Sequence, residues 1–139
     1  MYHYEVKHTT RVTREQIWKL WADVPNWKGW DTDLLSSVLK GNFQKGSLGV
    51  IKPKEGPKVK FEIIECTKLK SFTSRSYLPL CKMDFIHMME ETKDGLEITH
   101  KIEMSGPMTF LFSKVIGSKA KVGLPKAIEN LIDLAEITK

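Results

Sequence analysis

Residues 13–31, TREQIWKLWADVPNWKGWD, begin with a helix start signal and contain all four tryptophans of the chain. Thr13 can accept a hydrogen bond from the backbone amide of Gln16, whose side chain can reach back to the amide of Thr13, which is the pattern of a capping box. The apolar residues that follow recur three and four positions apart, as on one face of a helix. Pro25 either ends this helix or begins another. The stretch therefore predicts one helix that ends near Asp23 and a second, very short one after it.

The segments on either side of this stretch have the pattern of strands. Residues 2–12 alternate between two faces, which is the period of a half-buried strand. Six further strands are expected between Asp33 and Gly106, over residues 33–40, 47–52, 57–66, 69–78, 81–91 and 96–105. Short turns rich in glycine and proline separate them. Because a parallel pairing needs a crossover of a dozen residues or more, these short connections predict an antiparallel meander.

The C-terminal region changes to a helical period. Ser105 can cap a helix and Pro107 is tolerated in its first turn, so we expect the helix to begin near Gly106. Its apolar stripe at three- and four-residue spacing consists of Leu124, Ala127, Ile128, Leu131 and Ala135. Two glycines and Pro125 interrupt the segment, which predicts a looser first half and a regular helix from about Leu124.

Length and composition indicate one globular unit. The 139 residues fit a single domain over 1–139, with a core large enough to enclose a cavity. No apolar run approaches the ~20 residues of a membrane span, and the first residues lack the features of a secretory signal. Cys66 and Cys81 have no CxxC spacing, which is typical of reduced thiols in a cytoplasmic protein. Metal ligands are isolated along the chain, so we expect no metal and no cofactor.

The net charge of +5 raises the question of nucleic acid. Residues 45–70 hold seven lysines against three glutamates, and this lysine-rich hairpin could dock a protein or an RNA. It lacks the alternating aromatic residues and arginines of single-strand binding surfaces. Lysines that alternate with apolar residues are more typical of the solvated face of a strand, where they discourage aggregation. We therefore do not favour a nucleic-acid partner.

The order of these parts is one strand, two short helices, six strands and a long final helix. This order resembles the helix-grip fold of the START-like superfamily, also called SRPBCC, and in particular its polyketide cyclase/dehydrase and lipid-transport group. The resemblance covers nearly the whole chain, through TREQIWKLWADVPNWKGWD, GNFQKGSLG, FIHMMEETKDGLEITHKIEMSGP and LPKAIENLIDLAE. It implies an α+β fold in which a curved antiparallel sheet of about seven strands wraps around the C-terminal helix and a hydrophobic cavity.

The cavity implied by the resemblance would hold a hydrophobic small molecule, such as a lipid, a quinone or a polyketide. We expect Trp18 and Trp21 to be core residues, because they share one face of the first helix. The expected ligand-binding residues are Trp27, Trp30, Phe61, Phe72, Tyr77, Phe85, Met104 and Phe110. An indole suits such a wall because it offers a large apolar surface and one N–H donor.

His87 and His100 are the candidate catalytic residues, since both lie on apolar strand faces. If Thr92 pairs with Gly95, the two histidines face each other; a bulged three-residue loop would place Met88 opposite His100 instead. Two neutral imidazoles in a cavity could act as acid and base in a cyclisation and dehydration. Hydrogen-bonded structural histidines are the favoured interpretation, and a cyclase or dehydratase is the alternative.

Overall fold

The computed structural model describes residues 1–137. Its elements, in chain order, are β1 (Tyr2–Thr10), α1 (Arg14–Ala22), the 3₁₀ helix η1 (Val24–Gly29), β2 (Leu34–Leu39), β3 (Leu48–Pro53), β4 (Val59–Thr67), β5 (Ser71–Leu78), β6 (Cys81–Thr92), β7 (Gly95–Ser105) and α2 (Thr109–Ile137). The predicted α+β fold class and element order are confirmed. No helix within residues 1–137 is long and apolar enough to cross a membrane.

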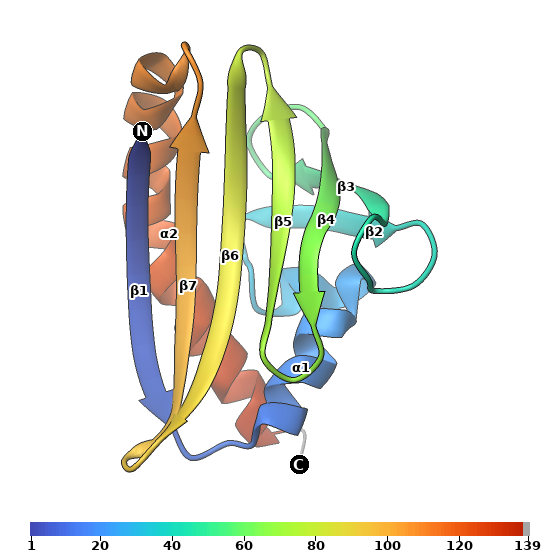
Figure 1. The fold of residues 1–139 in the computed structure, drawn as a ribbon, viewed down its shortest axis with the longest axis vertical. Coiled ribbons are helices and arrows are strands. Elements are labelled where there is room, and N and C mark those ends of the chain that lie inside the picture. Colours follow the sequence, from blue (N-terminus) through green and yellow to red (C-terminus); the bar gives the residue numbers. More distant parts are fainter. Residues whose placement is uncertain (138–139) are drawn as a thin grey trace.

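All seven strands form one antiparallel sheet in the order β1-β7-β6-β5-β4-β3-β2. The sheet is strongly curled, because β2 and β3 run across the direction of the longer strands (Figure 1). The long helix α2 lies diagonally behind the long strands, and α1 covers their lower end (Figure 1). The concave side of the sheet therefore faces the helices, and the site described below lies between them.

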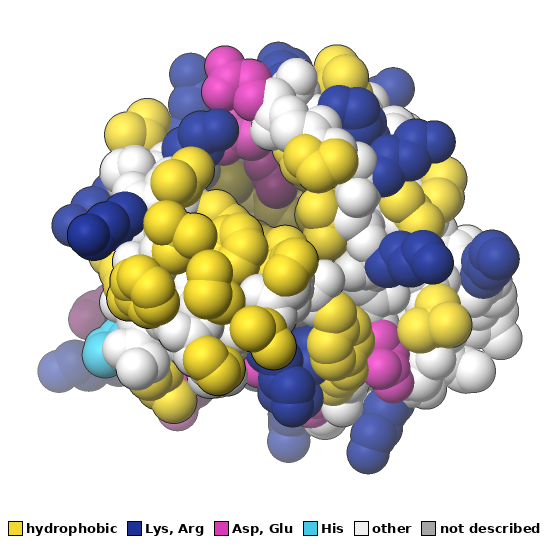
Figure 2. All heavy atoms as spheres, turned by 90° about the horizontal axis from the view of Figure 1, so that it is seen from above, with side chains coloured by type: hydrophobic (Ala, Val, Ile, Leu, Met, Phe, Trp, Pro, Cys, Tyr) yellow, Lys and Arg dark blue, Asp and Glu magenta, His cyan; other side chains and the backbone are white. Residues whose placement is uncertain are grey.

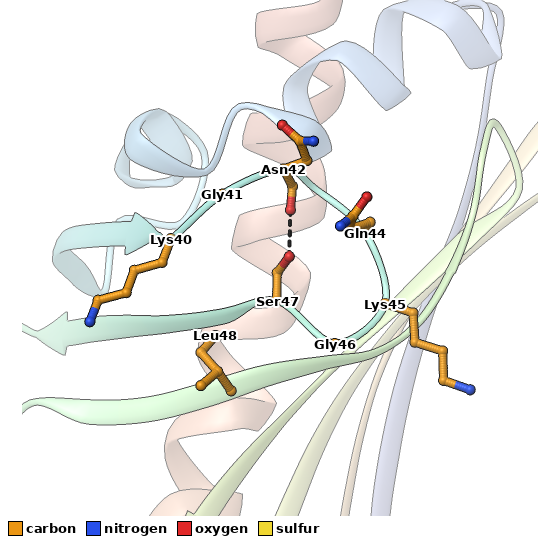
Figure 3. Close-up of a pocket in the computed structure, with 8 residues that line it drawn as sticks. All are labelled: Lys40, Gly41, Asn42, Gln44, Lys45, Gly46, Ser47 and Leu48. Carbon is orange, nitrogen blue, oxygen red and sulfur yellow. Dashed lines mark hydrogen bonds between the residues drawn. The ribbon is translucent and has the colours of Figure 1, made fainter.

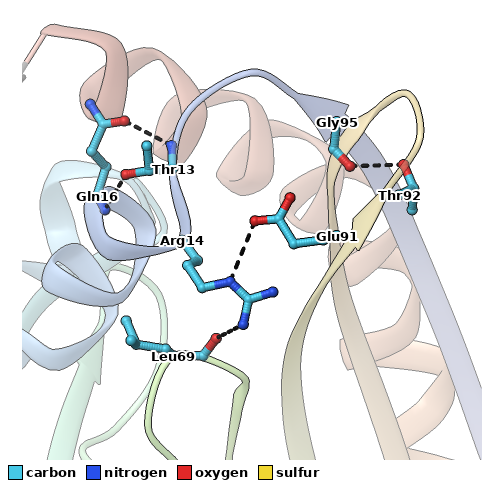
Figure 4. A network of polar contacts seen from close by, with 7 residues as sticks. All are labelled: Thr13, Arg14, Gln16, Leu69, Glu91, Thr92 and Gly95. Atoms are coloured by element: carbon cyan, nitrogen blue, oxygen red, sulfur yellow. Dashed lines mark hydrogen bonds and ion pairs between the residues drawn. The ribbon is translucent and has the colours of Figure 1, made fainter.

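The helix start predicted at Thr13 is confirmed. The Thr13 hydroxyl accepts a hydrogen bond from the Gln16 amide at 3.2 Å, and Gln16 Oε1 accepts one from the Thr13 amide at 2.8 Å (Figure 4). Gln16 Nε2 also donates to the carbonyl of Ala135 near the end of α2, at 3.0 Å. Arg14 binds Glu91 and the carbonyl of Leu69, which lie in or beside the sheet (Figure 4). These contacts hold α1 across the lower end of the sheet and against α2.

The turn between β6 and β7 settles the register that the sequence left open. Thr92 pairs with Gly95, and His87 pairs with His100. The Thr92 hydroxyl donates to the carbonyl of Gly95 at 2.8 Å (Figure 4) and accepts from the amide of Asp94 at 3.2 Å. The two histidines are therefore direct cross-strand neighbours on the inner face of the sheet.

The C-terminal helix differs from the prediction at its start. It begins at Thr109 and not near Gly106, because Gly106 has a left-handed φ of +115° that a helix does not admit. The amide of Met108 instead donates to the carbonyl of Leu80 in the β5–β6 turn, at 3.1 Å. From Thr109 the helix is continuous to Ile137, so the two glycines and Pro125, which were expected to break or kink it, do not break it.

The interior has two clusters of buried apolar side chains. The larger one joins α1, η1 and the second half of α2 to β4, β5 and β7. The smaller one joins the first half of α2 to β6 and β7, and its fully buried members are Cys81, Met83, Ile102 and Met104. Only Thr109 and Gly117 are buried in α2 before Ala127, whereas five residues are buried from there on. The expected looseness of the first half of α2 is therefore one of packing and not of helix continuity.

Candidate functional site

His87 and His100 lie at the centre of an aromatic box. Their ring centroids are 4.8 Å apart with the planes nearly perpendicular. Phe72 of β5 stacks on His87 at 4.0 Å, while Trp21 of α1 and Trp30 after η1 approach both histidines at centroid distances between 5.7 and 6.2 Å. The site is thus assembled from the sheet, from α1 and from the loop after η1.

Burial keeps both histidines neutral at physiological pH. Removal from water lowers the pKa of His87 from 6.5 to about 3, an effect that nearby backbone groups of Phe72 and Phe85 offset in part. Burial also lowers the pKa of His100, and the neighbouring His87 and then His8 lower it further. Each neutral ring has one N–H donor and one nitrogen acceptor, so the pair can serve a ligand in either role.

Six buried polar atoms in the part of the chain that the structure describes have no hydrogen-bond partner. They are Tyr2 Oη, Trp21 Nε1, Trp30 Nε1, Ser76 Oγ, His87 Nδ1 and His100 Nε2. Burying a polar group unpaired costs about 1–3 kcal/mol, and native proteins tolerate few such groups. Four of the six belong to the aromatic box, which is therefore equipped to bind polar atoms that the protein does not itself supply.

The two tryptophans expected to line a cavity have different roles. Trp27 donates its indole N–H to the carbonyl of Trp21 at 2.9 Å and stacks on Phe61 and Phe72. Its donor is used and its ring fills the core. Trp30 is equally buried, at 4% exposure, but its indole N–H is unpaired. Trp30 is consequently the tryptophan of this pair that could donate to a ligand.

The surface is hollowed at the end of the molecule where α2 begins. Figure 2, which views the molecule from above, shows a hollow bordered by hydrophobic side chains with acidic side chains at its margin. The apolar residues around the smaller cluster are only partly buried: Tyr2, Tyr4, Leu78, Phe85, Met108, Phe112, Ile116, Ala120 and Leu124. Apolar side chains of this kind around a hollow are the lining that binding sites for apolar molecules have.

Asp31 and Asp33 lie in the loop between η1 and β2, against α2. The pKa of Asp31 is raised from 3.8 to about 6, chiefly by burial and also by the charge of Asp33, while a hydrogen bond from the Asp33 amide acts against both. The carboxylate of Asp33 lies so close to Gly123 that a Cβ there would be 2.5 Å from Oδ2. Sequence reasoning had no signal for this approach, because it depends on how the loop meets the helix.

Two further depressions lie on the surface, away from the histidines. One, of about 550 Å³, is formed by the β2–β3 loop, where the Ser47 hydroxyl donates to the carbonyl of Asn42 at 2.7 Å (Figure 3). The other, of about 360 Å³, lies beside the β5–β6 turn and the start of α2. Within residues 1–137, no group of three or more histidine, cysteine or acidic side chains could hold a metal ion.

Comparison with solved structures shows what this architecture is. Protein MLL2253 from Mesorhizobium loti superposes with a TM-score of 0.79 over 99% of both chains, at 16% identity. Ara h 8.0201 superposes with a TM-score of 0.77 over 99% of both chains, at 12% identity. The di-domain ARO/CYC protein StfQ from the steffimycin biosynthetic pathway gives 0.77 at 9% identity, over 96% of this chain and 50% of StfQ. The chain has the helix-grip fold. No protein-family model matches the sequence, and no curated protein matches it.

The helix-grip sheet brings most of the predicted site residues to its concave side. Trp27, Trp30, Phe61, Phe72 and Met104 are buried there with both histidines, and Phe85 is partly buried. Ser76 was missed by sequence reasoning, although its place between Phe72 and the β5–β6 turn on the inner face follows from strand alternation.

Two expected cavity residues lie elsewhere. Tyr77 is 54% exposed on the outer face of the sheet, where its hydroxyl donates to Glu62 at 3.4 Å. It shares that face with Arg75, which forms a bidentate pair with Asp84, because odd-numbered residues of β5 point outward. Phe110 is 65% exposed on the first turn of α2. Neither side chain faces the interior.

Proposed function

We propose that this protein binds a hydrophobic small molecule between the sheet and the first half of α2, as a member of the START-like superfamily and its polyketide cyclase/dehydrase and lipid-transport group. The observation that carries the proposal is that the partly buried apolar side chains of the smaller cluster lie beside the unpaired polar atoms of the aromatic box, two residues along β6 and β7. Two unpaired cysteines favour a cytoplasmic location.

The ligand that fits this interior is mainly apolar with one polar end. Each Å² of apolar ligand surface removed from water contributes about 25 cal/mol, so a lipid, quinone or polyketide that loses a few hundred Å² gains useful affinity. Its polar end would meet the Trp30 indole N–H, the Ser76 hydroxyl and His100 Nε2. A carbonyl or hydroxyl group would satisfy such a mixed set of donors and acceptors.

The first test is mass spectrometry of the purified protein under non-denaturing conditions, followed by titration with the apolar fluorescent probe anilinonaphthalene sulfonate. A co-purified hydrophobic molecule, or probe binding with defined stoichiometry, supports the proposal. A protein that carries nothing and binds no probe contradicts it, because the interior would then be closed to ligands.

Two tryptophan variants distinguish ligand contact from core packing. Trp30→Phe removes an unpaired donor, so we expect ligand affinity to fall about tenfold while the unliganded fold persists. Trp27→Phe is the matched control: it removes the hydrogen bond to Trp21, so it lowers stability without a direct effect on ligand affinity. If both variants lose stability and affinity in parallel, Trp30 is a packing residue only.

The cross-strand contact of two neutral histidines favours a second candidate, an enzyme of the cyclase or dehydratase type. One imidazole would remove a proton from a bound polyketide while the other donates a proton to the leaving hydroxyl group. His87→Gln and His100→Gln each keep a polar side chain in place, so turnover of a polyketide substrate should fall about 100-fold while the fold persists and ligand affinity falls far less. Equal loss of stability and turnover would count against catalysis.

A further inference from the structure

The end of the molecule where α2 begins carries a group of exposed apolar side chains. Leu80 in the β5–β6 turn is 68% exposed, Phe110 65% and Leu111 46%. The carbonyl of Leu80 accepts the amide of Met108, so the turn and the helix start form one surface. Figure 2 shows hydrophobic side chains gathered on this end, beside the hollow. We define the apical patch as Leu80, Phe110, Leu111 and, one helical turn further, Val115, which is 56% exposed.

Leucine at position 80 is not explained by the turn itself. Its φ is +54°, a left-handed conformation that is strained for leucine and that glycine adopts without strain. The side chain is mostly exposed, so core packing does not compensate for that strain. The turn therefore exposes an apolar side chain at a position where the backbone conformation favours glycine and the contact with solvent favours a polar residue.

The first half of α2 has an outer apolar stripe with lysines on both sides. Since successive helix residues are rotated by about 100°, Leu111, Val115 and Val122 fall on one outer stripe. Lys114 and Lys121 flank it on one side and Lys119 on the other. This is the arrangement of helices that lie in a membrane interface, where apolar groups enter the lipid and lysines meet the headgroups.

The positive charge of the first half of α2 indicates which kind of partner the patch fits. Residues 104–128 contain four lysines and no aspartate or glutamate, and the first turn of α2 has no acidic residue to oppose the positive end of the helix dipole. Lys114, Lys119 and Lys121 are all exposed, and Lys119 pairs with Glu55 of the β3–β4 loop at 3.2 Å. An apolar group flanked by Lys114 and Lys121 is complementary to a lipid surface that carries anionic headgroups.

We propose that the apical patch and the lysines beside it dock this protein on an anionic lipid membrane. Leu80 and Phe110 enter the acyl boundary, and Lys114 and Lys121 bind the headgroups. The hollow opens on the same end (Figure 2), so docking would bring its mouth to the membrane from which an apolar ligand could enter. The docking surface stands on its own observations and does not require the ligand proposal to hold.

The experiment is co-sedimentation of the protein with vesicles of phosphatidylcholine alone or mixed with phosphatidylserine, at low and at high salt. We expect the wild type to bind the anionic vesicles, and to bind them more weakly at high salt because salt screens the lysines. Absence of binding by the wild type to anionic vesicles overturns the proposal.

Two variants test the apolar contacts. Leu80→Gly removes the side chain and relieves the backbone, so it stays folded, and the double variant Phe110→Ser with Leu111→Ser removes the helix contribution. Each should weaken vesicle binding by about tenfold. The control is Val38→Ser with Leu48→Ser, which changes two residues of similar exposure on β2 and β3. Equal weakening in the control overturns the proposal.

A charge-reversal pair tests the lysines against a control variant of equal net charge. Lys114→Glu with Lys121→Glu should weaken binding to anionic vesicles by more than about 20-fold, since each lysine near such a surface contributes about fivefold. Lys68→Glu with Lys93→Glu makes the same change of net charge in the turns at the opposite end, and should have little effect.

Light scattering of the wild type and Leu80→Gly tests whether the patch joins two copies of the chain. A wild-type dimer that this variant dissociates, together with absent vesicle binding, would assign the patch to self-association instead.

Discussion

At the scale of single residues, Ser76 offers the simplest test of the interior. Its side chain is 1% exposed and its hydroxyl has no partner. Ser76→Ala removes an unpaired polar atom at almost constant shape, so we expect unliganded stability to stay the same or rise by about 1 kcal/mol. Ligand affinity should fall, because the hydroxyl would no longer bind the polar end. Chemical denaturation and probe titration measure the two effects, and a clear loss of stability would show that the hydroxyl is already paired.

The buried histidines predict how stability depends on pH. The unfolded chain takes up a proton on His87 near its ordinary pKa of 6.5, whereas the folded chain does so only near pH 3. Protons therefore favour unfolding, and stability should fall from about pH 6.5 downward by ~1.4 kcal/mol per pH unit for each of the two histidines. Thermal unfolding between pH 7 and pH 4 measures this slope.

Asp31 affects the pH dependence of stability in the opposite direction from the histidines. Its folded pKa is raised to about 6 from 3.8, so the folded chain takes up this proton first and gains stability as pH falls between these values. We expect Asp31→Asn to steepen the acid loss of stability and His87→Phe to reduce it. His3→Asn, on the exposed face of β1, is the control. An unchanged slope in His87→Phe would mean that His87 is not held neutral by burial.

At the scale of elements, two glycines govern how close α2 comes to its neighbours. A Cβ on Gly117 would lie 2.7 Å from the hydroxyl of Tyr2 and 2.8 Å from its ring, whereas one on Gly123 would meet only the end of the Asp33 carboxylate. Alanine favours a helix interior by about 1 kcal/mol over glycine. We expect Gly123→Ala to be neutral or stabilising, because Asp33 can turn toward solvent.

Gly117→Ala should lower stability by roughly 1–2 kcal/mol, since the partly buried Tyr2 ring must shift. The double variant Tyr2→Ala with Gly117→Ala removes the clash, so the two changes should not add. Urea unfolding of the single and double variants measures this coupling. Additive effects would show that β1 and α2 can separate without cost.

The two halves of α2 should differ in local stability. Because the first half buries few side chains, we expect backbone amides of residues 110–122 to exchange hydrogen faster than those of residues 127–136. A bound ligand would fill the space beside the first half and slow its exchange. Hydrogen-exchange mass spectrometry of the protein with and without anilinonaphthalene sulfonate tests both statements. Uniform exchange along the helix would contradict the packing difference.

Local signals in the sequence predicted the elements well. The Thr13–Gln16 capping box placed the start of α1, and six strand candidates fall within two residues of the observed strands. The start of α2 could not be predicted, because it depends on a contact between Met108 and Leu80 that joins distant parts of the chain. The register of β6 and β7 likewise needed the structure, since glycine at position 95 suits both kinds of turn.

At the scale of the whole molecule, the candidate site was predictable only where strand alternation settles direction. The alternation of strand residues correctly placed His87 and His100 together on the inner face. Tyr77 lies on the outer face, because it is one residue away from the inward-facing Ser76. Nothing local distinguishes Trp27 from Trp30, because the hydrogen bond that occupies one indole goes to the end of a different helix. The fold was therefore more predictable than the distribution of free donors within it.

Ligand removal should destabilise the whole molecule. A ligand present at 100 times its dissociation constant adds about 2.7 kcal/mol to the folded state, which for a chain of this size corresponds to roughly 5–10 °C in Tm. If mass spectrometry finds a co-purified molecule, extraction on a hydrophobic resin should lower Tm by this amount and return of the extract should restore it. An unchanged Tm would show that the molecule binds the folded and unfolded chains alike.

The pairing of β1 with β7 joins the first strand of the chain to the last, with Tyr2 opposite Met104. During synthesis, β1 leaves the ribosome long before its only partner strand exists. β1 must remain unpaired until β7 has emerged. Its backbone hydrogen-bonding groups therefore lack a partner strand for most of the time that translation takes. Contacts between such distant segments also slow folding, because a long loop must close before they form. The pairing of β1 with β7 is therefore a late event in folding, and chaperones have a long interval in which to act on the nascent chain.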